Sequence, residues 1–456
     1  MATDATDPSV PRVPADPAGP VDDSPTASLS LASLLRLSVY WLGLVAVFSG
    51  IGVILQERAK TLIPDETMRF TTVGLVQLIG VIVAVVVQPT VGSISDYTVS
   101  RFGRRKPYVL IGTLLDVVFL TGLATSNTLL MVAAFVLLLQ FSSNFAQGPF
   151  QGYVPDLVPP HQVGLASGMV GLFQVLGVVT GTALAVVGTR TGDYTLPTIM
   201  LGVIELLTML SLFFRLEEGR RAKDRHGRRW RSVAAEAWGT DILAERSFVF
   251  LVASRFFILG GSAFLVVLSV PFLERALALT DPDERGNWLL AVTIVVALCT
   301  AVATIPAARL SERLGRKRVI YGACLLGATG MTICALAPSI ALVFLGAILV
   351  GVGGGSFLAV DWALMTDIIP KASSGRYMGI SNVATATNGV VAGFIGGIIV
   401  DQLAKSTDPG LGPRLAFLVA PFWFAIGALL LHQVREGRRE DPAPQAVVAI
   451  SAPPIG

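Results

Sequence analysis

Four amide side chains recur in LLLQFSSNFAQGPFQGY at a spacing that could build a binding surface. They are separated by four, three and four residues, which places them on one face of a helix. Amides both donate and accept hydrogen bonds, so such a face suits neutral hydroxylated ligands such as sugars. Against lipid the same groups would lack partners; the alternative is that they hold neighbouring helices together. The four residues are Gln140, Asn144, Gln147 and Gln151.

Two opposite charges interrupt other apolar runs, Arg255 in LVASRFFILGG and Asp361 in FLAVDWALM. Arg255 lies about 12 Å inside its run at 1.5 Å per helical residue, and Asp361 lies at a comparable depth. A central arginine costs roughly 2.5–3.5 kcal/mol on membrane-insertion scales, so it needs a partner or a watery pocket. We therefore predict an Arg255–Asp361 ion pair. The alternative is that Arg255 extends along its own stem to the lipid headgroups.

Two further acids, Asp116 and Glu205, also stand inside apolar runs. A carboxyl group in a medium of low dielectric constant holds its proton more tightly and can carry it. Asp361, then Asp116, and also Glu205 are therefore candidates for proton coupling. For Asp116 and Glu205 the alternative is a neutral, hydrogen-bonded structural role.

Cations gather in SDYTVSRFGRRKP, residues 95–107, between two apolar runs. Gly103 permits a tight turn there, and arginine can clamp carboxylates at helix ends through two parallel hydrogen bonds. The segment contains Asp96, followed by Arg101, Arg104, Arg105 and Lys106.

The elements that must position these residues are membrane helices. The chain is 53% hydrophobic and only 14% charged, against about 25% charged residues in soluble domains. A membrane helix needs roughly 20 mainly apolar residues. We predict twelve such spans, at 35–56, 68–92, 107–126, 128–152, 163–189, 196–215, 247–272, 287–308, 318–337, 339–363, 376–401 and 414–434.

The distribution of Lys and Arg predicts the orientation, because cytoplasmic loops retain positive charge. With the N-terminus inside, the inner loops hold 23 of these residues and the outer loops 8. We therefore expect both termini in the cytoplasm and the protein in the cell inner (plasma) membrane. Prolines at every third position from Pro8 to Pro20 favour an extended or disordered tail.

Two short matches divide the spans six and six. FGRRKP (102–107) resembles LGRKRV (314–319), and YVPDLVP (153–159) resembles LMTDIIP (364–370), at offsets of 212 and 211 residues. Parallel repeats of this kind occur in secondary transporters. We predict an all-α membrane protein with two six-helix bundles related by pseudo-two-fold symmetry. Its parts are a tail 1–33, a bundle 34–215, a basic linker 216–246, a bundle 247–434 and a tail 435–456.

Over roughly residues 34–434 the chain resembles the major facilitator superfamily. The family pattern after the second span, G-x-x-x-D-R-x-G-R-[RK], is met by Gly92, Asp96, Gly103, Arg104 and Arg105, although Tyr97 replaces the usual Arg. Four extra residues separate Asp96 from Gly103. That longer form, S-D-x-x-x-S-R-F-G-R-R-x-P, is similar to the proton-coupled sucrose transporters of plants and their animal relatives.

The resemblance implies roles for these residues. The first, fourth, seventh and tenth helices would line a central cavity, so the four amides, Arg255 and Asp361 are the expected substrate-cavity residues. Asp96 and Arg104 would belong to a cytoplasmic latch that holds the two halves together when the carrier faces outward. The alternative is that these charges only fix the topology. The expected members of this gate are Asp96, Arg101, Gly103, Arg104, Arg105, Asp156, Arg316 and Asp367.

Other classes of protein are disfavoured by the sequence. An enzyme would need a nucleophile with a base, a metal cluster or a phosphate cradle, and the chain has neither a Gly-x-Ser-x-Gly motif nor a Walker loop. Its three cysteines and three histidines have no metal-ligand spacing, and a net charge of +3 does not indicate nucleic acid. We expect a monomer that needs no cofactor.

The expected function is secondary active transport, with protons carried together with a sugar or glycoside. A proton-driven exporter of a hydrophobic metabolite or drug remains the alternative within transport. A membrane sensor or assembly factor on the same scaffold is the alternative outside it. An amide-poor, aromatic-lined cavity would favour the exporter, and a filled cavity would favour the sensor.

Overall fold

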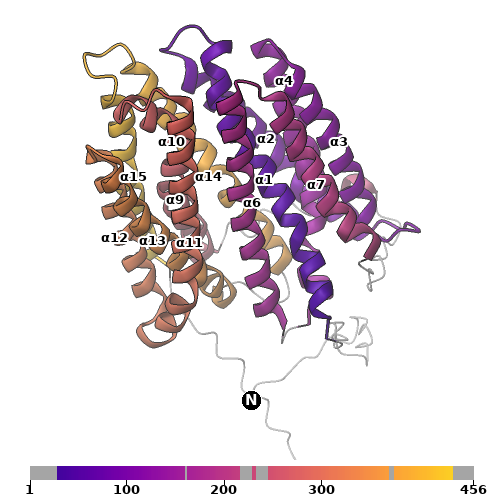
Figure 1. The fold of residues 1–456 in the computed structure, drawn as a ribbon. Helices are drawn as coiled ribbons and strands as arrows, with labels where there is room; N and C mark the ends of the chain where they lie inside the picture. The colour runs from indigo at the N-terminus through magenta and orange to yellow at the C-terminus, as the bar shows by residue number, and fades with distance from the viewer. Residues whose placement is uncertain (1–27, 160–161, 216–228, 233–244, 369–373, 435–456) are drawn as a thin grey trace, which may run out of the picture.

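The structure, a computed structural model, describes residues 28–159, 162–215, 229–232, 245–368 and 374–434 (Figure 1). Within these ranges the chain is helical and contains no β-strand. Among the described residues, twelve helices are long and apolar enough to cross a membrane. The predicted tails 1–33 and 435–456 and linker 216–246 lie mainly outside the described residues.

The N-terminal half begins with α1, whose start is fixed by Ser30. The Ser30 side chain accepts a hydrogen bond from the Ser33 amide at 3.2 Å and so caps the helix. Thr128 caps α4 in the same way, through the Met131 amide at 3.3 Å. The helices of this half are α1 Leu31–Leu62, α2 Arg69–Asp96, α3 Lys106–Thr125, α4 Leu129–Gln151, the short α5 Tyr153–Leu157, α6 Val163–Thr191 and α7 Thr195–Arg215.

The C-terminal half also contains six long helices, and two short helical segments, α10 and η3, lie between the first two of them. Asp281 caps α11 through the Glu284 amide at 3.0 Å, with Pro282 at the first helical position. The helices are α9 Arg246–Val267, α10 Ser269–Pro271, η3 Phe272–Ala276, α11 Pro282–Leu314, α12 Arg316–Leu336, α13 Ile340–Ile368, α14 Ser374–Gln402 and α15 Leu411–His432.

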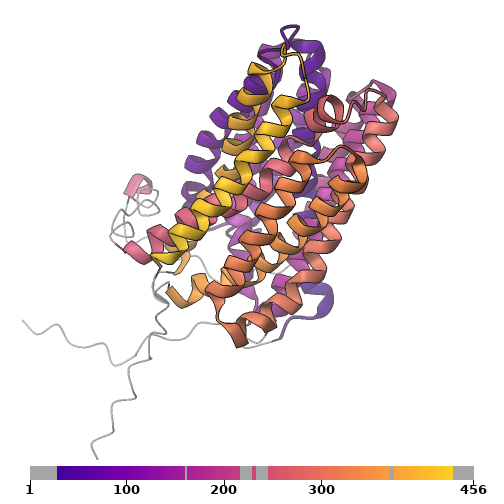
Figure 2. The ribbon, with the colours of Figure 1, turned by 90° about the vertical axis from the view of Figure 1, so that its left-hand side faces the viewer.

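The two halves lie side by side, the N-terminal one in indigo to magenta and the C-terminal one in orange to yellow (Figures 1 and 2). They meet where α2 packs on α14 and where α6 packs on α11. We call the end that carries the loop 97–105 the basic end, and the end where α1 stops and α11 starts the opposite end.

At the opposite end the helices of the two halves pack closely. A Cβ at Gly74 of α2 would lie 2.7 Å from the Phe394 Cα of α14, and one at Gly397 would lie 2.7 Å from the Phe70 carbonyl oxygen. On α6, nothing lies within 4 Å of the Cβ positions of Gly164 and Gly168, toward the basic end. Among the described glycines, the close contacts between the halves thus lie at the opposite end.

The predicted sequence repeat has a matching backbone conformation. Gly103 has a φ of 110° and Gly315 a φ of 92°, and the two glycines are aligned in the repeat. Such positive values favour glycine because a Cβ would clash with the backbone. Each glycine turns the chain between two long helices at the basic end.

Candidate functional site

Arg255 and Asp361, the opposite charges predicted to pair, are in contact in the C-terminal half. Nη2 of Arg255 on α9 lies 3.0 Å from Oδ2 of Asp361 on α13. The side chains are 4% and 0% exposed, so Arg255 does not extend to the headgroups. Charges withdrawn this far from water persist only when each has a partner.

Helix α14 adds two hydroxyl groups to this ion pair. Arg255 donates through Nη1 to Ser381 Oγ and through Nη2 to Thr385 Oγ1, the latter at 3.4 Å. Arg255 Nε and Asp361 Oδ1 are buried and form no hydrogen bond with any described residue. The pair therefore joins three helices and retains one donor and one acceptor for a further group.

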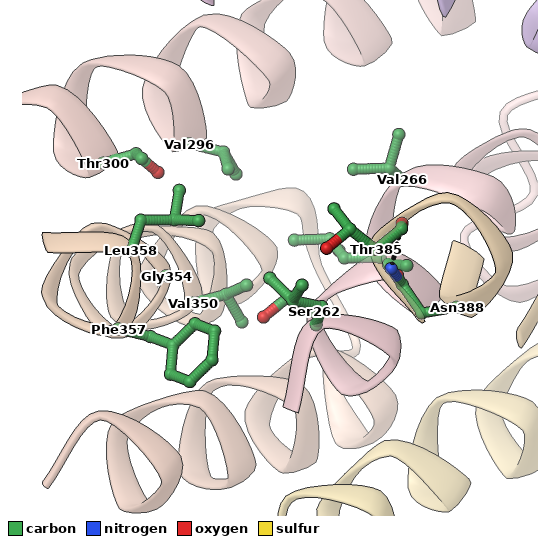
Figure 3. A pocket seen from close by; sticks show the side chains of 13 residues that line it. Ser262, Val266, Val296, Thr300, Val350, Gly354, Phe357, Leu358, Thr385 and Asn388 are labelled. Atoms are coloured by element: carbon green, nitrogen blue, oxygen red, sulfur yellow. Dashed lines mark hydrogen bonds between the residues drawn. The ribbon is translucent and has the colours of Figure 1, made fainter. Parts of the chain in front are cut away.

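A pocket of about 260 Å³ adjoins the ion pair through Thr385, which stands in its wall. The wall is formed by α9, α11, α13 and α14 (Figure 3). Apolar side chains dominate it, among them Val266, Phe357 and Leu358. Its polar side chains are Ser262, Thr300, Thr385 and Asn388.

The amide stripe of α4 lies in the other half, and none of its members lines this pocket. Gln140 packs against α2, where a Cβ at Gly80 would lie 2.8 Å from Gln140 Cγ. Asn144 is 3% exposed and donates from Nδ2 to the Gln140 carbonyl oxygen at 2.8 Å. Gln147 and Gln151 are half-buried. Their assignment to the cavity stays a prediction.

Asp116 and Glu205, predicted separately, share one buried cluster in the N-terminal half. Asp116 accepts hydrogen bonds from Ser142 and Ser143 of α4, the second at 2.9 Å. Glu205 of α7 accepts one from Tyr40 of α1 at 3.4 Å. Both carboxyl groups are fully buried.

The basic loop forms ion pairs with two acids of its own half. Arg105 Nη2 is 2.8 Å from Asp96 Oδ1 and 2.8 Å from Asp156 Oδ2. Arg104 pairs with Asp156 and lies 3.8 Å from Asp96. The Arg104 and Arg105 side chains are 6% and 7% exposed. These contacts tie the end of α2 to α5 within the N-terminal half, and a bond across to the other half stays a prediction.

For the other residues of the predicted gate, the structure gives a position and few contacts. Arg101 is exposed, with its guanidinium 4.6 Å from the centre of the Phe102 ring. Gly103 makes the turn described above, and Arg316 starts α12. Asp367 lies near the end of α13.

One ionic cluster at the opposite end is not predicted from the sequence. Arg285 of α11 faces Glu57 of α1, with Nε–Oε1 and Nη2–Oε2 both 3.2 Å. Their side chains are 6% and 5% exposed. Lys60 pairs with Glu57 at 2.8 Å and also with Glu274. This cluster, named the opposite-end cluster, links the two halves.

The signal for this cluster is present in the sequence, just outside the predicted spans. The predicted spans end at 56 and resume at 287, so Glu57 and Arg285 fall in predicted loops. Helix α1 instead continues to Leu62 and α11 begins at Pro282. The spacing of Glu57 and Lys60, three residues apart on one helical face, could have indicated the continuation.

The sequence description of the Major Facilitator Superfamily matches residues 29–295 and 253–454 of this chain. Together these ranges cover all of the described helices. Proteins of this family are transporters rather than enzymes.

Curated relatives match shorter regions. An uncharacterized MFS-type transporter of Mycobacterium tuberculosis is 29% identical over 135 residues, which are 30% of this chain and 19% of that protein. An MFS-type efflux pump of Pseudozyma antarctica is 29% identical over 142 residues, 30% of this chain and 26% of the pump. A sucrose transport protein of Oryza sativa subsp. indica is 32% identical over 126 residues, 23% of this chain and 25% of that protein. The matches thus span about a quarter or less of the length of each of these relatives.

Solved structures match almost the whole chain. A D-xylose-proton symporter superimposes with a TM-score of 0.66 at 16% identity, over 89% of this chain and 98% of the symporter. A bacterial homologue of the human lysosomal transporter Spinster, inward-facing and occupied, gives 0.64 at 14%, over 88% and 96%. At these identities the likeness establishes the fold.

Proposed function

Because this chain belongs to the major facilitator superfamily of membrane transporters, we propose that it carries a sugar or glycoside together with protons. The transported compound would bind between the two halves, at the ion pair and pocket of the C-terminal half. The observation that carries this proposal is the buried Arg255–Asp361 pair beside the pocket, where Arg255 Nε and Asp361 Oδ1 form no hydrogen bond with any described residue.

The chemistry of the pocket favours a glycoside over a free sugar. Hydroxyl groups of the substrate would bond to Thr385, Asn388 and the free atoms of the ion pair. An apolar aglycone would contact Phe357 and Val266 in the same pocket. Burying apolar ligand surface contributes roughly 25 cal/mol per Å², whereas a free sugar would leave those walls facing its hydroxyls.

The amide stripe supports the same assignment from the other half. Gln147 and Gln151 are half-buried, so they have surface left to contact a hydroxylated ligand if the stripe faces the cavity. The sucrose transport protein among the relatives supports sugar as the substrate.

Alternating access would use the two ends of the molecule in turn. The opposite-end cluster joins the halves in this structure, as expected for a carrier that faces the basic end. In the outward-facing state Asp96 and Arg104 would close the basic end instead. We place that end in the cytoplasm of the cell inner membrane, because its loops carry most of the Lys and Arg.

The test is uptake of labelled sugars and aryl glycosides by proteoliposomes, with and without an imposed pH gradient. We expect accumulation of a glycoside that depends on the gradient. No uptake across the panel, with export of a hydrophobic dye instead, would contradict the proposal.

A matched pair of variants ties transport to the pocket. Gly354 lines the pocket, and its nearest neighbour would lie 3.9 Å from a Cβ, so Gly354→Leu fills the space. Gly322 of α12 is exposed with nothing within 4 Å, so Gly322→Leu serves as the control. We expect at least a tenfold rise in KM for Gly354→Leu alone.

Export of a hydrophobic compound is the second candidate. The observation in its favour is the apolar majority of the pocket wall, and a fungal relative is named an efflux pump. The two candidates differ in the direction of movement and in the need for hydroxyl groups on the substrate, which the same proteoliposomes would reveal.

A further inference from the structure

Six polar side chains form a closed cluster in the N-terminal half, and none of them lines the pocket. They come from four helices: α1, α3, α4 and α7. Tyr40, Thr113, Asp116, Ser142, Ser143 and Glu205 are each at most 1% exposed. We call this set the acid cluster.

Close helix packing keeps the acid cluster dry. On α1, a Cβ at Gly43 would lie 2.7 Å from the Glu205 Cα of α7. On α3, a Cβ at Gly112 would lie 2.7 Å from the Ser142 carbonyl oxygen of α4. The two glycines thus bring the four helices together around the carboxyl groups and leave little room for water between them.

Tyr40 links the helices that carry the two carboxyl groups: its hydroxyl lies 2.6 Å from Thr113 Oγ1, one turn before Asp116 on α3, and 3.4 Å from Glu205 Oε1 of α7. No described Lys, Arg or His pairs with either. Among the described residues, the side chains that donate hydrogen bonds to these two carboxyl groups are Tyr40, Ser142 and Ser143. Two carboxylates in one buried cluster without a described cation repel each other, so ionising both is strongly disfavoured.

The hydroxyl groups that donate to the two carboxyl groups leave one carboxyl oxygen without a described hydrogen-bond donor. Ser142 and Ser143 donate to the two oxygens of Asp116, and Tyr40 reaches Glu205 Oε1. Glu205 Oε2 is fully buried and accepts no hydrogen bond from any described group. A proton held between the two carboxyls would fill this gap.

We propose that Asp116 and Glu205 bind one proton between them, and that this proton is the coupling ion of the transport cycle. The second part rests on the proposed function and replaces Asp361 as its first candidate. Asp361 faces Arg255 at 3.0 Å, which favours its ionised form, whereas the acid cluster has no described cation.

Helix α4 connects the acid cluster to the amide stripe. Ser143, a donor to Asp116, directly precedes Asn144 of the stripe. When the proton leaves, the added negative charge strengthens the hydrogen bonds from the α4 hydroxyls and draws Tyr40, now 3.4 Å away, toward Glu205. That change would move α4 relative to α1 and α7, and so alter the surface that meets the substrate.

The first test needs no substrate. Infrared spectra of the full-length protein in lipid, in H₂O and D₂O, report the carbonyl stretch of a protonated carboxyl group. We expect Glu205→Gln to abolish a band that the wild type shows at neutral pH, because the introduced amide donates to Asp116 in place of the proton. Asp116→Asn/Glu205→Gln, which keeps both shapes, should also lack it.

The control removes the competing acid. Arg255→Met/Asp361→Leu should leave the band unchanged. A band that survives in both Glu205 variants, or that disappears only when Asp361 is removed, would overturn the shared proton.

The second test separates coupling from binding. In proteoliposomes, Glu205→Gln should lose pH-gradient-driven accumulation of a labelled glycoside but keep counterflow exchange within about twofold of wild type. Gradient-driven accumulation at the wild-type level would refute the coupling role. If the wild type moves no glycoside at all, the proposed function fails, while the infrared result still decides the proton.

Discussion

Arg285 and Glu57 meet across the boundary between the two halves as a two-fold hydrogen-bonded pair, with both N–O distances 3.2 Å. The pair is almost fully buried, and Arg285 Nη1 also donates to the Leu279 and Thr280 carbonyls. An ion pair in this position both holds α1 against α11 and blocks that end of the molecule.

Breaking this pair should destabilise the closed opposite end. Glu57→Gln leaves the Arg285 charge buried without its anion, and loss of one partner of a buried pair costs about 3–5 kcal/mol. Thermal unfolding in detergent, followed by tryptophan fluorescence, measures the loss. Labelling of a cysteine at Val186, which packs against Gly286 of α11, should also become faster.

An exposed pair between α6 and α11 provides the control. Arg190 and Asp283 lie 3.8 Å apart, with side chains 42% and 68% exposed. Arg190→Gln should cost at most about 1 kcal/mol, because water screens such pairs. Equal losses for the two variants would contradict a structural role specific to Glu57.

At the Arg255–Asp361 pair, we expect that transport can be lost without a loss of stability. Asp361→Asn leaves a buried arginine with only hydroxyl partners, so we expect a loss of about 3–5 kcal/mol. Arg255→Met/Asp361→Leu removes both charges, and apolar replacement of a buried pair is often neutral or stabilising. The double variant should therefore unfold near the wild-type temperature but transport nothing.

Exchanging the two charges tests the contact itself. Arg255→Asp/Asp361→Arg should recover part of the stability that each single reversal loses. Full recovery is not expected, because Ser381 and Thr385 are placed for a guanidinium on α9. A double reversal no better than its parents would show that the two residues act independently.

Asp96 should matter for turnover more than for folding. In Asp96→Asn, Asp156 still pairs with both arginines, so we expect an unfolding temperature near that of the wild type. Transport should slow severalfold if Asp96 also closes the basic end in the outward-facing state. Normal transport would remove the latch role.

A double variant that removes both Asp96 and Asp156 tests how much these two carboxylates contribute to stability. Asp96→Asn/Asp156→Asn leaves Arg104 and Arg105 buried without a carboxylate from this cluster, so the unfolding temperature should fall markedly. Arg101→Gln, at an exposed position, should change it little.

Replacing glycine by alanine should have opposite effects on stability at the two turns and within a helix. Gly103→Ala and Gly315→Ala place a Cβ at φ values of 110° and 92°, and each should cost roughly 1–2 kcal/mol. Gly322→Ala, inside α12 with open space around it, should instead stabilise by about 0.5–1 kcal/mol. Unfolding temperatures of the three variants check the signs.

The parts of the fold that follow from local physics could be predicted from the sequence. Runs of about 20 apolar residues have to span a membrane as helices, and a charge within such a run needs a partner at its own depth. The second requirement led from Arg255 to Asp361. The aligned glycines Gly103 and Gly315 likewise reflect a backbone demand that is local to each turn.

Contacts that depend on which helices meet could not be predicted in this way. Asp116 and Glu205 each read as an isolated acid, because nothing in either segment says that α3 and α7 converge on α1. The partner of Arg104 was equally undetermined, since Asp156 and Asp367 occupy matching places in the repeat. The Glu57–Arg285 pair could not be predicted for a different reason. The apolar runs are shorter than the helices α1 and α11, so both residues lie beyond the predicted spans.

The hydrophobic core extends across the boundary between the halves. Ile54 and Leu55 of α1 belong to the same buried group as Val270, Leu273 and Leu289 of the C-terminal half. Separating the halves at the opposite end would therefore expose apolar side chains to water as well as break ion pairs. Because the attraction between apolar groups weakens on cooling, a lower temperature should favour separation of the two halves at the opposite end.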